Sequence, residues 1–597
     1  MLRHAPRVPL PALGLLAAIS GCALEGGASA ESPGVMALDE LGARNRAHTE
    51  LLIRERYPSA EQCRNCHPDH YREWSVSPHA YAQLSPIFNA MQGTLLKKTN
   101  GTLGDFCIRC HTPIGMSIGE PVFAPNADRS EVSREGVTCI VCHRVNQDFG
   151  KNFGRRSLEA HDIFAPIYGP RDGAELERVL RSDSFGAVVT EPEKLGRRIH
   201  REARLFEPIT HSGFCGACHD VTLLNFRLEE AFSEYKLSPA ADRGESCQDC
   251  HMGNEPGIAS GYRNEPAAYV GGFPTSPAKR TDHMFVGPDY SVVHPGIFPH
   301  SPEAQELASI EEWLDFDWRA DWGTDEFEDE VTDDRKFPER WNSVDDRYDA
   351  REIIEDQLSL IAEARERATQ LLRRGYRLGD IEVEKAHPHG IKFRVRVENG
   401  TDGHNAPTGF VSERLVFLHV ILTSASGEVV FESGDLDPNG DVRDLHSRYV
   451  HNGDLPLDDQ LFSLQSNFIT RNERGGERES ILSVNESLDP LPFLRPDTSA
   501  SILTGRPQGM RIHKHGIEPN GHRWANYEVD ASKLTGEGSY RLRVELVAGM
   551  VPVNLIGAIQ HVGFDYGMSP REVADAVVEG HRILWEREIE IQIRNPR

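Results

Sequence analysis

Ten of the eleven cysteines in this 597-residue chain fall into five copies of one pattern, Cys-x-x-Cys-His. Two thiols three positions apart lie about one helical turn from each other, so both can form thioethers with the vinyl groups of one porphyrin. The histidine that follows is then placed to coordinate the iron as its proximal ligand. The copies are Cys63, Cys66 and His67; Cys107, Cys110 and His111; Cys139, Cys142 and His143; Cys215, Cys218 and His219; and Cys247, Cys250 and His251. We therefore predict five covalently bound haem c groups.

Two other uses of paired cysteines explain the pattern less well. Zinc ribbons are built from Cys-x-x-Cys units, but zinc does not require a histidine directly after each pair. A disulfide framework would suit an oxidising compartment, yet it also leaves the five histidines unexplained. Haem attachment accounts for the thiols and the histidine of every copy, so the sequence favours it over both alternatives.

The ligand on the other side of each iron decides what a haem can do. An iron with two protein ligands is restricted to electron transfer, whereas an iron with a free position can bind or activate a small molecule. Methionine is scarce near the motifs and is better explained there as a packing residue. Histidine is better supplied and is the expected distal ligand. The same segment also contains His70, His79, His161, His200, His211, His283, His294 and His300.

Several short stretches resemble the multihaem cytochromes that are related to the nitrifier tetrahaem cytochrome and hydroxylamine oxidoreductase. They are Cys63 to Ala80 with its Tyr71, Trp74, Ser77 and His79, then Gly136 to Cys139, Tyr168 to Pro170, Phe214 to His219, and Asp282 with His283. The resemblance implies that His79, His200 and His283 are distal ligands. For a further iron we prefer His161 to His211, because His211 lies only four residues before Cys215.

A further candidate ligand lies much later in the chain. Gly403 to Gly409 reads Gly-His-Asn-Ala-Pro-Thr-Gly and resembles the Gly-His-x-Pro-Thr-Gly turn of long multihaem cytochromes with a β-rich C-terminal domain. The resemblance implies that His404 is a distal ligand, which would require the two domains to pack against each other across a haem. The extra residue before Pro407 departs from the pattern, and a surface turn explains the stretch equally well.

The N-terminal segment has the features of an export signal. Arg3 and Arg7 precede an apolar stretch from Val8 to Ile19 that is too short to span a membrane. The residues Ile-Ser-Gly-Cys that end at Cys22 resemble the lipobox of bacterial lipoproteins. The resemblance implies lipidation of Cys22 and anchoring to the bacterial cell envelope, in the periplasm or at the outer membrane. The alternative is ordinary signal-peptide cleavage that discards Cys22.

Hydrophobic patterning predicts an α+β multidomain fold, with a mostly helical or irregular multihaem domain followed by an antiparallel β-sandwich. An apolar stripe from Ile354 to Leu372 predicts a helix that ends at Gly375. Alternating residues in Ile391 to Val397 and in Tyr540 to Val547 predict strands. The expected divisions are a signal segment 1–22, a linker 23–58, a haem domain 59–305, an acidic linker 306–345, a connecting helix 346–377 and a β-sandwich-like domain 378–597.

The formal charge of −27 argues against a basic surface for nucleic acid. Part of this charge is concentrated between Glu311 and Asp334, where twelve acidic residues accompany a single base, Arg319. Such a run usually forms a solvated linker. The alternative is a docking surface for a cationic partner, with salt-sensitive association.

These features favour electron transfer through five haem groups, most of them with two histidine ligands. The expected partners are redox proteins, either other cytochromes or a membrane oxidoreductase. The alternative is a multihaem oxidoreductase that acts on a small nitrogen or sulfur compound at a five-coordinate haem. A third interpretation is a structural unit of a surface complex, which would form homo-oligomers. The sequence leaves open whether the chain is an enzyme, although it favours electron transfer over catalysis.

Overall fold

The computed structural model describes residues 53, 56–147, 154–223, 226–292, 300–332, 334–471, 477–483 and 510–594. The predicted signal segment and the predicted lipidation site Cys22 lie outside these residues. Among the described residues, no helix is both long and apolar enough to cross a lipid bilayer. The predicted α+β class is confirmed, with short helices in the first half of the chain and antiparallel sheets in the second.

Each Cys-x-x-Cys-His motif begins in or forms a short helix, as the thioether spacing requires. These helices are α2 (Glu61–Arg64), α5 (Ile108–His111), α8 (Cys139–His143), α10 (Ser212–Gly216) and α13 (Cys247–His251). The other helices of this part are α3 (Pro68–Ser75), α4 (Pro86–Lys98), α6 (Pro113–Ile118), α7 (Glu131–Arg134), α9 (Ala174–Arg181), α11 (Ala231–Tyr235) and α12 (Pro239–Asp242). Their buried apolar residues form several small separate clusters and no continuous core.

Within the described residues of the first half, the strands occur only in two-stranded pairs. Two pairs are parallel: β1 (Ile167–Gly169) with β4 (Ala203–Leu205), and β2 (Val188–Val189) with β3 (Arg197–Arg198). Three pairs are antiparallel: β5 (Val221–Leu223) with β6 (Phe226–Glu229), β7 (Arg263–Pro266) with β10 (Pro277–Arg280), and β8 (Tyr269–Val270) with β9 (Phe273–Pro274). Such small sheets support loops around the motifs and cannot form an independent core.

The segment that the sequence predicts as an acidic linker is folded. It begins within α14 (Pro302–Leu307) and contains α15 (Ile310–Leu314) and α16 (Asp325–Glu330), and aromatic residues of the segment pack in a buried cluster. The Trp313 and Trp341 indoles donate hydrogen bonds to the carbonyls of Ala304 and Glu312, at 2.9 and 2.8 Å. The members of the cluster are Ala304, Ala308, Trp313, Phe316, Trp322, Trp341, Ala350 and Ile354. The expectation of a solvated linker was therefore wrong, because these buried side chains give the segment a core of its own.

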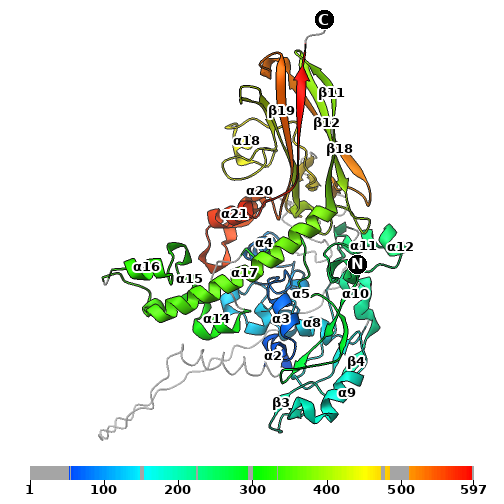
Figure 1. The fold of residues 1–597 in the computed structure, drawn as a ribbon, viewed down its shortest axis with the longest axis vertical. Helices are drawn as coiled ribbons and strands as arrows, with labels where there is room; N and C mark the ends of the chain where they lie inside the picture. The colour runs from blue at the N-terminus through cyan, green and yellow to red at the C-terminus, as the bar shows by residue number, and fades with distance from the viewer. Residues whose placement is uncertain are drawn as a thin grey trace, which may run out of the picture. The chain divides into compact units, whose positions relative to one another are not determined.

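One long helix, α17 (Val344–Gly375, 32 residues), connects this segment to the sheets. It begins slightly earlier than predicted, because the side chain of Ser343 caps it by accepting a hydrogen bond from the backbone N–H of Asp346. The predicted apolar stripe is buried at Ile354, Ala368 and Leu372. In Figure 1, α17 runs diagonally between the short helices of the first half and the strands that gather near the C-terminus.

Two antiparallel sheets form the sandwich. One has the strand order β11 (Tyr376–His387), β12 (Gly390–Asn399), β18 (His522–Asp530). The other has the order β14 (Val429–Ser433), β13 (Leu415–Ser424), β19 (Gly538–Gly549), β20 (Arg582–Ile593). A single continuous core contains inward-facing residues of both sheets, among them Phe393, Leu418 and Leu542. Inward alternation on facing strands is the pattern expected of a β-sandwich.

Smaller elements complete the second half of the chain. A third sheet has the order β16 (Glu477–Ser480), β15 (Asn467–Arg471), β17 (Met510–His513), and the remaining helices are α18 (Arg448–Asn452), α20 (Val553–Ile559) and α21 (Pro570–Glu579). Helices α20 and α21 share a buried cluster with Ile87 and Ala90 of α4. This cluster packs the β-rich half directly onto α4 of the motif-bearing half.

Candidate functional site

All five motifs open onto one cavity. Its volume is about 1710 Å³, and all ten motif cysteines and all five motif histidines line it. Pockets for a single small ligand usually measure about 300–1,000 Å³, so this cavity has room for more than one such group. The ten thiols are free and half-buried, with no disulfide between them. The donor set and the space therefore fit covalently attached porphyrins.

Cysteines of different motifs lie close together. The thiol of Cys63 is within hydrogen-bonding reach of Cys139, which joins the first and third motifs. The same contact joins Cys110 to Cys218, and Cys215 to Cys247. The motif at Cys215 therefore adjoins the second and the fifth motifs directly. We refer to it below as the junction site.

Four of the motif histidines are held through Nδ1 by backbone carbonyls. Since a carbonyl only accepts hydrogen bonds, Nδ1 must carry the proton, and Nε2 is left with a free lone pair for a metal. The N–O distances are 2.7 Å for His67 to Ala267, 2.9 Å for His111 to Ala82, 2.9 Å for His143 to Tyr168 and 3.2 Å for His251 to Val286. The fold thus fixes the tautomer that a proximal ligand needs.

The fifth motif histidine, His219, has a different partner. Its Nδ1 lies 3.2 Å from Oε1 of Glu229, a carboxylate on β6. Burial lowers the pKa of His219, but the hydrogen bond and negative charge of Glu229 more than offset this and raise it to about 9. At His67, His111 and His143, by contrast, burial leaves the pKa below its ordinary value.

Two of the predicted distal histidines face a motif histidine at a distance that suits a shared iron. A metal–imidazole bond is about 2 Å long, so two imidazoles on opposite sides of one iron have ring centres about 6 Å apart. The rings of His79 and His219 are 6.2 Å apart, and those of His404 and His251 are 6.4 Å apart. Both pairs line the cavity.

Two further predicted ligands lie beside the remaining motifs on this wall. The pKa of His200 is lowered to about 3, first by burial and then by the charge of His67. The pKa of His283 is also lowered to about 3, first by burial and then by the charge of His143. Both histidines line the same cavity as the first and third motifs. His70 also lies 5.9 Å from His67, but it belongs to α3, whose N-cap is His67, and its ring is closer to His283, at 4.7 Å.

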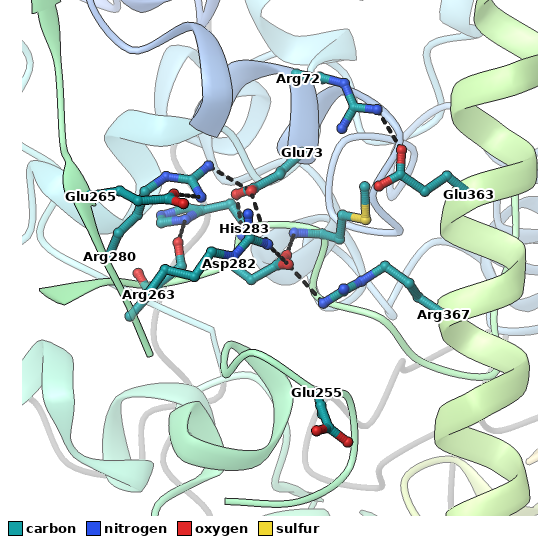
Figure 2. A network of polar contacts seen from close by, with 12 residues as sticks. Arg72, Glu73, Glu255, Arg263, Glu265, Arg280, Asp282, His283, Glu363 and Arg367 are labelled. Atoms are coloured by element: carbon teal, nitrogen blue, oxygen red, sulfur yellow. Dashed lines mark hydrogen bonds and ion pairs between the residues drawn. The ribbon is translucent and has the colours of Figure 1, made fainter. Parts of the chain in front are cut away.

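A buried ionic network fixes the backbone around His283 (Figure 2). The Glu73 carboxylate accepts hydrogen bonds from the His283 backbone N–H at 2.9 Å and from the Arg280 guanidinium at 2.6 Å. Asp282 accepts from the Met284 backbone N–H at 2.8 Å and forms a 2.7 Å ion pair with Arg367 of α17. Burial raises the pKa of Glu73. No sequence pattern predicts this network, because its members are far apart in the chain.

The loop that carries His404 belongs to the β-rich half and is held by hydrogen bonds to α11 of the first half. Glu234 of α11 accepts hydrogen bonds from the Asn405 side-chain amide at 2.7 Å and from the Thr408 hydroxyl at 2.5 Å. The peptide between Ala406 and Pro407 is cis. The stretch is thus a turn that inserts His404 into the cavity, and not a free surface turn.

The two histidines predicted as alternatives for a further iron, His161 and His211, differ in their position relative to the cavity. His161 does not line the cavity: it is exposed, and its Nδ1 lies 3.1 Å from the Asp162 carboxylate. The preference for His161 over His211 was therefore wrong in position, because the ring faces outward. His211 does lie on the cavity wall.

His111 is a motif histidine without a facing partner among the described residues. Within these residues, its ring stacks on that of Phe88 at 3.7 Å, and no second histidine faces it. His294 lies outside the described residues.

Comparison with known proteins relates the chain to multihaem c-type cytochromes. Residues 62–144, which hold the first three motifs, match the sequence model of the family "Cytochrome c554 and c-prime". A putative tetraheme cytochrome c type protein of Allochromatium vinosum is 24% identical over 159 residues, covering 26% of this chain and 74% of that protein. A penta-heme cytochrome c552 from Thermochromatium tepidum has a TM-score of 0.46 and 16% identity, covering 90% of this chain and 99% of that one. The matched family and the tetraheme relative support haem c as the cofactor and electron transport as the general function.

Proposed function

We propose that this protein transfers electrons through five covalently bound haem c groups, at least four of them held by two histidines. The proposed pairs are His67 with His200, His143 with His283, His219 with His79, and His251 with His404. The observation that carries the proposal is the cavity in which five oriented motif histidines meet four further histidines, two of them at 6.2 and 6.4 Å between ring centres. Bound haem iron supplies reversible one-electron chemistry.

The protein's own contribution is orientation and spacing. Hydrogen bonds to Nδ1 turn each proximal Nε2 toward the cavity, and histidines on both sides would leave no position for a substrate. The thiol contacts connect the first motif to the third, and the junction site to the second and fifth. Cys142 of the third motif also influences Cys215 electrostatically. The five sites thus form one connected path.

Two measurements test this proposal on the complete chain, produced in cells that mature c-type cytochromes. The intact mass should exceed that of the polypeptide by five haems. His404→Ala should convert one haem from low spin to high spin, because it removes one axial ligand. His161→Ala is the matched control and should leave the spectrum unchanged. A mass without haem, or a low-spin spectrum untouched by His404→Ala, would refute the proposed assignment.

A second function is favoured by the surroundings of the His111 motif. No second histidine faces His111 within the described residues, and Asp289 and Glu413 line the cavity and influence His111 and Cys107 electrostatically. Burial raises the pKa of Glu413 to about 7, a value suited to proton transfer near neutral pH. This arrangement would suit an oxidoreductase acting on a small nitrogen or sulfur compound. A high-spin signal that shifts with nitrite, hydroxylamine or sulfite would support it, and the absence of any such signal would exclude it.

We further propose that the protein is exported and anchored to the cell envelope through lipid on Cys22, where redox proteins are its partners. Covalent haem attachment and the leader-like N-terminal sequence support the export of the chain. Cys22→Ser should release the mature protein from the membrane fraction into the soluble envelope fraction. If the variant and the wild type fractionate alike, the lipid anchor is wrong.

A further inference from the structure

One of the five motif histidines differs from the others in the acceptor at Nδ1. Four donate to a neutral backbone carbonyl, whereas His219 of the junction site faces the carboxylate of Glu229. We propose that Glu229 is a positioning residue that gives the junction haem the lowest reduction potential of the five. This inference rests on the proposed function and adds an order of reduction to it.

The contact is built into the local fold. The β5–β6 hairpin directly follows the motif and pairs Val221 with Glu229, which returns the chain to His219 after ten residues. Glu229 is partly buried, and within the described residues no lysine or arginine forms an ion pair with it. The next residue, Glu230, is instead paired with Lys514 at 2.5 Å. Glu229 therefore has its hydrogen-bonded contact with the His219 imidazole, and its charge also reaches His111 without a hydrogen bond.

A carboxylate draws the Nδ1 proton more strongly than a carbonyl does. The ring then gains imidazolate character and donates more electron density through Nε2, which stabilises ferric over ferrous iron. Hydrogen bonding to an axial ligand is one of the means by which a protein sets haem potential. The neutral carbonyl acceptors of the other four rings draw the Nδ1 proton less strongly, so those rings donate less electron density to their irons. The junction haem should therefore be the last to accept an electron.

The position of the junction site means that a low potential there would affect electron transfer between the other haems. The thiols of the junction site contact those of the second and fifth motifs, and its Cys215 is influenced by Cys142 of the third. An electron that moves between the first or third site and the second or fifth site has to cross the junction haem. Electrons would therefore occupy the outer haems first, with the hardest haem to reduce between them.

Glu229→Gln tests the proposal, with Glu230→Gln as the matched control. Both variants remove one negative charge from adjacent residues, but only the first alters the partner of His219. The complete haem-loaded proteins are titrated electrochemically, with electron paramagnetic resonance at each poised potential. In Glu229→Gln the oxidised-to-reduced equilibrium of the lowest-potential haem should change about tenfold, an upward shift of about 59 mV. Its low-spin g-values should also change, and Glu230→Gln should leave those g-values as they are.

A third variant identifies the haem. His79→Ala removes the proposed distal ligand of the junction site, so the lowest-potential low-spin signal of the wild type should be the one that is lost. This experiment does not require Glu229→Gln to mature. Loss of a low-spin signal other than the one of lowest potential would overturn the proposal. Five haems of normal ligation with no shift in Glu229→Gln would refute this inference alone. A deficit of haem in the wild type would instead refute the proposed function.

Discussion

The two halves of the molecule hold their interiors together in different ways. In the β-rich half, one continuous cluster of aliphatic and aromatic side chains fills the space between two sheets. In the motif-bearing half, the apolar clusters are small and separate, and they surround a cavity of about 1710 Å³ lined by thiols and imidazoles. Protein interiors are normally close-packed, so a cavity of this size implies that other groups complete the first half. The comparison indicates that one half depends on its cofactors and the other on its side chains.

The largest expected effect comes from withholding haem. When the chain is produced in cells that cannot attach c-type haem, we expect backbone amides of α8 and α13 to lose their protection from hydrogen exchange. Amides of β12, β13 and β19 should remain protected, because their core contains only side chains. Hydrogen exchange with mass spectrometry of the complete chain measures both regions at once. Equal protection in both halves would contradict the comparison.

A smaller effect is expected when the ionic network around His283 is broken. Arg280 and Glu73 are both buried, so Arg280→Ala leaves the Glu73 carboxylate with only the longer 4.0 Å ion pair to Arg263 and should cost about 3 kcal/mol of local stability. Hydrogen exchange near His283 should rise, with a change in the low-spin spectrum of one haem. Arg64→Ala removes the exposed pair with Glu303 in the same half and should cost no more than about 1 kcal/mol. Equal losses of stability in the two variants would show that burial does not determine how much each ion pair contributes.

The converse change removes apolar volume from the β-rich core. Leu542 is fully buried between the sheets, and Leu542→Ala should destabilise that half by about 2–5 kcal/mol through lost burial and a residual cavity. Faster exchange in β13 and β19, with unaltered haem spectra, is the expected result. Displacement of a haem ligand by this substitution would mean that the halves are less independent than their cores suggest.

A pH dependence of local stability is also expected near Asp441 in the β-rich half. Burial raises the pKa of Asp441 from its ordinary value of 3.8 to about 8. An acid with a raised folded-state pKa contributes stability below its unfolded-state pKa, and this contribution is lost as pH rises through the folded-state value. Local stability near Asp441 should therefore decline between about pH 4 and pH 8, and Asp441→Asn should flatten the decline. A parallel decline in both proteins would assign it to another group.

Covalent chemistry made part of the site predictable from sequence. Thioether attachment fixes the spacing of two thiols and a histidine along the chain, so each motif could be read locally. The acceptor of His67 is the carbonyl of Ala267, 200 residues away, and any residue type offers such a carbonyl. No local pattern could reveal that contact. The Glu229 carboxylate lies only ten residues after His219, but its role depends on a hairpin that brings the chain back.

The errors in the fold prediction have similar physical causes. The acidic residues of 311–334 dominate the composition of the segment, but Trp313, Trp322 and Trp341 build a buried cluster there. Most of the carboxylates remain at its surface, and the buried Glu328 is paired with Arg347. His161 has the right residue type in the right segment, but its ring turns outward to Asp162. His404 was found through a resemblance in sequence. Its partner His251 became apparent only when the two halves were placed together.

The central claim is that a cavity lined by oriented histidine pairs holds haem irons with two protein ligands each. Low-temperature electron paramagnetic resonance of the fully oxidised, haem-loaded protein, with quantitation of spins, tests this claim most directly. The account predicts at least four low-spin ferric haems per chain, corresponding to the pairs at His67, His143, His219 and His251. Fewer than four low-spin haems per chain, in a preparation whose mass contains five haems, would contradict it.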